Sequence, residues 1–210
     1  MRALYVTIIV IILFVVPFGV ENYAQSSIGI RAGSVISNPS YTAEMPDPRI
    51  VLDHATNFAV NGIIEARLEE HFSLVLEPGF VRKGLSMSNQ NYYPFLNIAA
   101  SADYIEFPVL LRMDFPAGFV NPYLYIGPGI AYRISEKVEA GGSRWLTPGF
   151  FARYDIGLNL GAGIAVPVMS DLSVFLDGRY SHGMNNLLKN GGSMKWSDLR
   201  IGGGLLLAIE

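Results

Sequence analysis

Residues 103–115 read DYIEFPVLLRMDF, and this stretch decides the fold. From position 105 to 115 every odd residue is apolar, whereas the even positions include Glu106, Arg112 and Asp114. A period of two over this length predicts a strand with one apolar face and one polar face. In a soluble sheet the apolar face would meet a core. In a membrane barrel it would meet lipid, and the polar face would line the interior.

The composition restricts the class of protein. Half of the 210 residues are hydrophobic, only 16% are charged, and the formal net charge is -3. A typical soluble domain has about 25% charged residues. No basic run is present, so we expect no nucleic-acid partner. The absence of cysteine from the sequence excludes disulfides, thiolate metal sites and a lipidated cysteine.

The N-terminal segment has the make-up of a secretory signal peptide. Arg2 precedes a nearly unbroken apolar run over residues 3–20, and Ala24 supplies a small residue before the expected cut. We therefore predict a signal peptide over residues 1–24 and a mature domain over residues 25–210. The apolar run also approaches the roughly 18 residues that can span a bilayer, so an uncleaved anchor is the alternative.

The remaining sequence alternates between two-faced segments and polar connections. Connections that follow the first, third, fifth and seventh segments are long, and those between are short. This pattern is typical of an up-and-down meander with all long loops at one end and all tight turns at the other. The predicted strands cover residues 26–37, 56–69, 71–83, 102–115, 119–135, 149–168, 171–185 and 196–209.

Charged residues away from the strand ends all fall on one face of these strands. Arginine greatly outnumbers lysine there, and arginines and acids occur in equal numbers, which indicates a closed space in which charges are paired. We therefore predict a lumen charge network of Arg31, Glu65, Arg67, Glu77, Glu106, Arg112, Asp114, Arg133, Arg153, Asp155, Asp177, Arg179, Asp198 and Arg200.

An apolar face without charges indicates a sheet whose apolar face points outward to lipid and whose polar face points inward. An arginine or lysine facing lipid at the bilayer midplane costs about 2–4 kcal/mol, and a sheet in lipid must close to leave no edge. We therefore predict an all-β fold, an eight-stranded antiparallel transmembrane β-barrel in the outer membrane. Two features do not fit this simple pattern: Pro78, Pro108, Pro122 and Pro128 lie inside strands, and the chain ends in Ala-Ile-Glu rather than in an aromatic residue.

Four segments carry a family resemblance. YIEFPVLLRMDF, NPYLYIGPGIAYRIS, DIGLNLGAGIAVPV and LSVFLDGRYSHGMNNL occur in this order and resemble the PorT-like outer-membrane β-barrel domain. The resemblance extends from about Ser26 to the C-terminus. It implies an outer-membrane location and, as for some members, a part in protein secretion; it implies no catalytic residues.

No convincing catalytic or metal-binding constellation is present in the sequence. Ser181 and His182 are a candidate pair for lipid hydrolysis, but neighbouring strand residues point to opposite faces, and no third residue orients the histidine. The acids Glu44, Asp47 and Asp53 lack the spacing of a calcium loop. We expect no enzymatic activity, no cofactor and no metal.

The resulting expectation is an envelope barrel with a lumen filled by side chains. Its partners would be outer-membrane lipid and other envelope or secretion proteins, contacted through long loops or periplasmic turns. Two alternatives remain at this point: a small transport barrel, and a soluble lipocalin-like barrel that binds an apolar ligand inside.

Overall fold

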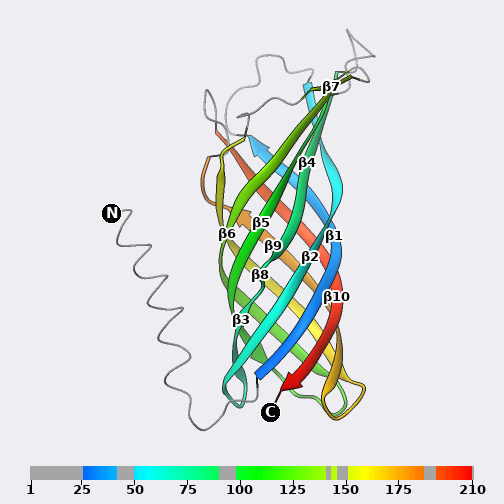
Figure 1. Cartoon of the computed structure of the whole chain (residues 1–210), viewed down its shortest axis with the longest axis vertical. Helices are drawn as coiled ribbons and strands as arrows, with labels where there is room; N and C mark the ends of the chain where they lie inside the picture. The colour runs from blue at the N-terminus through cyan, green and yellow to red at the C-terminus, as the bar shows by residue number, and fades with distance from the viewer. Residues whose placement is uncertain are drawn as a thin grey trace, which may run out of the picture.

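The backbone forms a closed antiparallel sheet (Figure 1). The computed structural model describes residues 26–41, 50–89, 98–140, 143–145, 151–186 and 193–209. Within these ranges there is no candidate for a membrane-crossing helix. The strands are β1 (Ser26–Tyr41), β2 (Ile50–Glu69), β3 (Phe72–Leu76), β4 (Gly79–Asn89), β5 (Ile98–Asp114), β6 (Asn121–Ala140), β7 (Ser143–Trp145), β8 (Tyr154–Pro167), β9 (Leu172–Gly183) and β10 (Met194–Ile209).

The sheet closes into a ring of eight strands. Closure occurs between the first and last strands, where β1 pairs with β10 from Ser26↔Ile209 to Tyr41↔Met194. β3 and β4 lie in series between β2 and β5 and together occupy one position in the ring. β7 is a three-residue extension that pairs only with the end of β6 among the described residues. The predicted meander of eight strands is therefore correct.

Several strands extend further toward the long connections than the sequence pattern predicts. β2 begins at residue 50 instead of 56, β4 ends at 89 instead of 83, and β6 ends at 140 instead of 135. The predicted start of a strand at residue 149 is wrong, because β8 begins later, at Tyr154, and is shorter at this end than predicted. The extensions rise above the main barrel in Figure 1. On β4 the inward residue in this part is the buried Leu85, so the rule that polar residues face the lumen no longer applies there.

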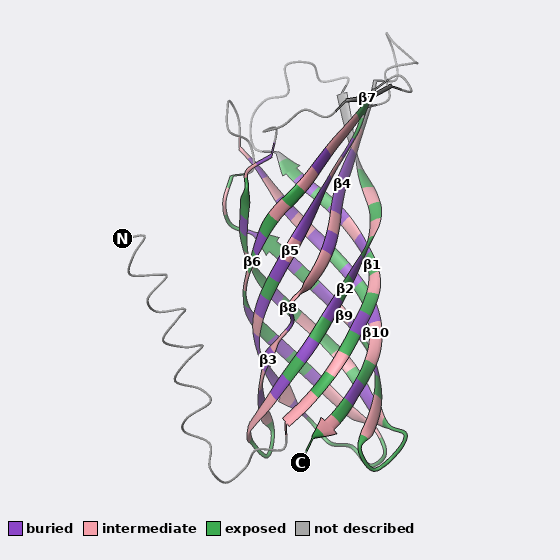
Figure 2. Cartoon of the chain, in the orientation of Figure 1, coloured by how far each residue is buried: buried purple, intermediate pink, exposed green. Residues whose placement is uncertain are grey.

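Buried and exposed residues alternate along the strands, as expected for a barrel with a polar interior and an apolar outer face (Figure 2). On β5, Glu106 and Arg112 are buried, whereas Phe107 and Leu111 on the other face are 45% and 44% exposed. The same outward face carries aliphatic residues around the ring, such as Ile30, with 58% of its surface exposed. An outward surface of this extent and composition is the lipid-facing band of a membrane barrel.

The prolines within the strands interrupt the hydrogen-bond ladder at adjacent places. Pro78 separates β3 from β4, and its carbonyl accepts a bond from Gly62 N at 2.8 Å. On the next strand, the Pro108 carbonyl accepts a bond from Glu77 N at 3.1 Å. Because proline has no N–H, neither can return the second bond of its antiparallel pair. One strand further, the β5–β6 pairing skips the two positions after Pro108, next to Pro128.

Candidate functional site

The interior of the barrel is the candidate site, and its middle layer consists of buried ion pairs. Three arginines from β1, β9 and β10 reach across the lumen to carboxylates on β9, in the break between β3 and β4, and on β5. All six side chains are at most 6% exposed, so each pair is removed from water and its charges must satisfy one another. The closest distances are 2.6 Å for Arg31–Asp177, 2.6 Å for Arg179–Glu77 and 2.6 Å for Arg200–Glu106.

Lys83 on β4 forms a fourth buried group in this layer. Its Nζ lies 2.8 Å from Asp155 Oδ2 and 2.8 Å from Asp198 Oδ2. It also lies 5.6 Å from the ring centroid of Tyr104. A single ammonium group thus contacts two carboxylates, one from β8 and one from β10.

A further ion-pair group lies at the short-turn end of the lumen. Arg112 Nη1 is 3.2 Å from Glu65 Oε2, and Arg112 Nη2 is 2.7 Å from Asp114 Oδ1. The guanidinium also lies over the ring of Tyr123, 3.9 Å from its centroid. Arg112, Glu65 and Asp114 line a polar cavity of about 160 Å³, together with serines near the turns.

An apolar cluster separates this polar cavity from the ion pairs of the middle layer. Tyr123 and Tyr125 of β6 stack with ring centroids 5.9 Å apart and pack with Phe175 of β9. A Cβ atom on Gly161 or Gly163 of β8 would overlap these tyrosine rings, so the glycines give the rings their space. The full cluster contains Ile63, Val75, Leu110, Tyr123, Tyr125, Ala165, Phe175 and Leu206.

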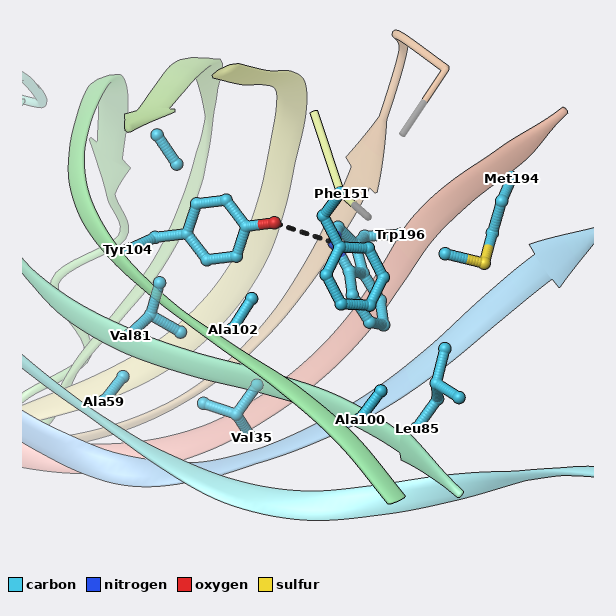
Figure 3. Close-up of a cluster of buried hydrophobic side chains, with 11 residues drawn as sticks. Val35, Ala59, Val81, Leu85, Ala100, Ala102, Tyr104, Phe151, Met194 and Trp196 are labelled. Atoms are coloured by element: carbon cyan, nitrogen blue, oxygen red, sulfur yellow. Dashed lines mark hydrogen bonds between the residues drawn. The ribbon is translucent and has the colours of Figure 1, made fainter. Parts of the chain in front are cut away.

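A second apolar cluster closes the lumen toward the long connections (Figure 3). Trp196 and Phe151 are both fully buried, with ring centroids 5.6 Å apart. The Trp196 indole N–H donates to the Tyr104 hydroxyl at 3.4 Å. Arg133 donates to the Phe151 carbonyl and pairs with Glu136, whose Oε2 accepts the Phe151 N–H at 3.3 Å. These contacts hold Phe151 inside the barrel mouth.

Two small cavities lie next to the ion pairs of the middle layer. One cavity of about 20 Å³ is lined by Tyr125 and by Glu77, the ion-pair partner of Arg179. Another cavity of about 30 Å³ is lined by Glu106 and Asp155. A water molecule requires roughly 10–15 Å³ by this kind of measure. Each of these two cavities therefore has room for individual waters, and neither is large enough to form an aqueous path through the lumen.

The predicted network residues do not all meet. The structure buries Arg31, Glu65, Glu77, Glu106, Arg112, Asp114, Asp155, Asp177, Arg179, Asp198 and Arg200. Arg133 lies apart from the middle layer, beside Phe151. Arg67 is half-buried at the polar cavity, and Arg153 is exposed with its guanidinium 5.9 Å from the Tyr132 ring centroid. Within the described residues, neither of these last two has a carboxylate partner.

The predicted charge network omitted three polar members of the interior. Lys83 and Asn61 both have the register of the polar face, and this signal was present in the sequence. Lys83 stands at the end of a predicted strand, where a charge is usually solvated. Glu136 faces inward only because the β5–β6 pairing shifts register between Asp103 and Tyr104, and no hydropathy signal reports such a bulge.

The structure does not bring the candidate hydrolytic pair together. Ser181 is buried and donates to Asn159 Oδ1 at 2.7 Å, whereas His182 is exposed on the outer face. His182 Nδ1 instead lies 3.4 Å from Ser197 Oγ. Among the described residues no group of three metal-ligating side chains converges. Of the acids considered for calcium, Glu44 and Asp47 lie outside the described residues.

A closed antiparallel ring with a lipid-facing exterior and a charge-paired interior defines an integral membrane β-barrel. A family model agrees over residues 23–189, and the chain belongs to the outer membrane protein beta-barrel domain family. This membership places the protein in the outer membrane. The narrower PorT-like resemblance is not resolved by that match. Curated protein sequences include no match to this chain.

Solved structures of outer-membrane proteins share the fold. Neisserial surface protein A matches with a TM-score of 0.51 and 15% identity, covering 87% of this chain and 97% of that one. The outer membrane protein OprG from Pseudomonas aeruginosa matches with a TM-score of 0.53 and 12% identity, covering 90% and 100%. A major outer membrane protein from Thermus thermophilus gives 0.51 and 12%, covering 88% and 99%. Identities this low speak for the fold alone.

Proposed function

We propose that the protein is a non-conducting barrel that acts as a structural or interaction component of the outer membrane. The observation that carries this proposal is the filled lumen, in which buried ion pairs lie between two apolar clusters. Transport of a solute would require both clusters and the ion pairs to separate. The proposal includes no enzymatic role, because Ser181 and His182 point to opposite faces of the sheet.

Contacts with other envelope proteins would then be made at the two ends of the barrel. Its outer wall is occupied by lipid, and its lumen is filled. Photocrosslinking residues placed at Ala117 and Ser170 in the short turns, and at Glu139 near the long connections, test this proposal in native outer membranes. We expect discrete protein adducts from at least one end and none from Leu160, which is 54% exposed in the lipid-facing band. Adducts from Leu160 alone, or none from either end, would contradict the proposal.

The resemblance to PorT-like domains supports a more specific role in protein secretion. The test compares proteins released into the medium by a strain that lacks the gene with those released by the complemented strain. We expect a defined set of secreted proteins to be retained in the periplasm of the deletion strain. An unchanged set of released proteins would remove the secretion role but leave the envelope-interaction proposal to be decided by crosslinking.

A further inference from the structure

The short-turn end of the barrel is acidic. Two exposed glutamates lie where β2 turns into β3, and Asp171 lies in the turn before β9. With the interior of this end included, the described residues here contribute five carboxylates and two guanidiniums: Glu65, Glu69, Glu70, Asp114 and Asp171 against Arg67 and Arg112. The short turns of outer-membrane barrels face the periplasm, so this excess of negative charge would attract basic periplasmic proteins.

The polar cavity of about 160 Å³ borders this acidic surface. Its lining includes Ser170 and Asp171, which are exposed in the turn. It also includes the buried carboxylates of Glu65 and Asp114, which are 6% and 5% exposed. A cavity of about 150 Å³ can hold a benzene molecule. The end of one long side chain of a partner protein has a similar size and therefore fits this space.

The lining of the cavity carries one surplus carboxylate. Its acids are Glu65, Asp114 and Asp171, and its cations are Arg67 and Arg112. Arg112 contacts both Glu65 and Asp114, so two carboxylates share one guanidinium. Asp114 Oδ1 accepts both bonds from Arg112, at 3.1 and 2.7 Å, and Asp114 Oδ2 has no hydrogen-bond partner among the described residues. Buried polar atoms without a partner are rare in native proteins, so this carboxylate lacks a donor.

We propose that the short-turn end binds a basic segment of a periplasmic protein and that the cavity takes one lysine side chain of this segment. The lysine ammonium would neutralise the surplus charge and donate to Asp114, and its two other donors would reach oxygens such as Ser173 Oγ. The aliphatic stem would pack on Ala165 and Leu206, the apolar part of the lining. This inference specifies the partner of the interaction role proposed above and rests on that role.

The test uses the purified chain in uncharged detergent micelles and a fluorescein-labelled peptide of alternating lysine and glycine. A matched peptide carries Nε-acetyllysine at every lysine position and so lacks the positive charges. Fluorescence anisotropy measures the binding of both peptides. We expect saturable binding of the lysine peptide, weakening as the NaCl concentration rises, and no binding of the acetylated peptide. Equal binding of the two peptides, or no binding of the lysine peptide, would overturn the proposal.

Two variants that remove the same charge locate the binding. Asp114→Asn is expected to weaken binding of the lysine peptide about tenfold, because the charge lies in the cavity. Glu70→Gln removes an exposed carboxylate of the β2–β3 turn and is expected to weaken binding by less than about twofold. Equal effects of the two changes would contradict a site in the cavity.

A measurement on the wild-type chain decides if Asp114→Asn does not fold. With methyl-labelled alanines, nuclear Overhauser contacts are expected from the lysine methylenes of the bound peptide to Ala165 and Ala208, which line the cavity. None are expected to Ala162, which is exposed on the outer wall. A bound peptide without contacts to Ala165 and Ala208 would overturn the proposal.

Failure of this inference and failure of the proposed function give different results. Protein adducts at Ser170 in native membranes, with full peptide affinity in Asp114→Asn, would support the interaction role and contradict the lysine site. Peptide binding that depends on Asp114, without adducts from either end of the barrel, would support the site and contradict the interaction role.

Discussion

The Glu106 carboxylate of the middle layer accepts hydrogen bonds from two different side chains. It accepts bonds from Arg200 Nη1 at 2.6 Å and from Arg200 Nη2 at 2.9 Å, and a third from Asn61 Nδ2 at 3.0 Å. The two bonds from one guanidinium form a bidentate pair, which combines charge with a fixed geometry. A leucine at this position would fill part of the volume but would leave Arg200 buried without this partner.

We therefore expect Glu106→Leu to lower the free energy of unfolding by about 3–5 kcal/mol. The double variant Glu106→Leu/Arg200→Leu is expected to regain most of this loss, because it removes both charges rather than one. Urea titrations of the folded barrel in micelles provide the values for a double-mutant cycle. Additive losses from the two single changes would show that the pair is not coupled and would contradict this account.

The neighbouring outward residue Val109 tests the other face of the same strand. Val109→Arg places a charge against lipid and is expected to cost about 2–4 kcal/mol at the bilayer midplane. Its matched control, Val109→Leu, should stay near the wild-type value in the same titration. If only the orientation of a residue toward lumen or lipid mattered, Glu106→Leu would lower the free energy of unfolding less than Val109→Arg. The three hydrogen bonds at Glu106 remove that difference, so we expect losses of similar size.

At the scale of elements, the break between β3 and β4 is compensated from inside the barrel. Pro108 has no N–H to return to the carbonyl of Glu77, the residue directly after the β3–β5 pairing, whose N–H donates to Pro108. The Asn61 amide donates to this carbonyl at 3.3 Å and to Glu106 at 3.0 Å. A side chain on β2 thus supplies the bond that the proline omits, which explains how a closed sheet tolerates proline here.

This arrangement predicts an interaction between positions 61 and 108. Asn61→Leu leaves a buried carbonyl without its donor and should cost about 1–3 kcal/mol. In a Pro108→Val background the new N–H faces the Glu77 carbonyl, and the same change should cost less. Asn57→Leu serves as the control, because among the described residues the Asn57 amide donates only one bond, of 3.5 Å, to the Ala55 carbonyl. An equal cost of Asn61→Leu in both backgrounds would contradict the proposed compensation.

For the whole molecule, the period of two and the order of long and short connections were sufficient to predict the ring, its closure and its orientation toward lipid. Membership of the outer membrane protein beta-barrel domain family agrees with this prediction. The soluble lipocalin-like alternative is wrong, because the aliphatic face points outward. The signal peptide over residues 1–24 lies outside the described residues and stays a prediction.

The interior was less predictable than the ring. The alternation along a strand assigns a residue to the lumen, but it does not give its position along the barrel axis. It therefore cannot distinguish Arg153 at the rim from Arg179 in the centre. Pairing across the lumen depends on the tilt and register of strands far apart in sequence, as for Arg31 and Asp177. The alternation predicts a polar inner face, and it therefore does not predict the apolar clusters around Trp196 and Phe175.

The central claim is that the apolar face meets lipid while the polar face fills a closed lumen. Single-channel recordings of the purified chain in planar bilayers test this claim most directly, with insertion verified by protease protection of the reconstituted barrel. We predict no stable open state, since ion pairs such as Arg179–Glu77 and the two apolar clusters block the interior. A stable, large conductance from verified, correctly folded barrels would contradict the account.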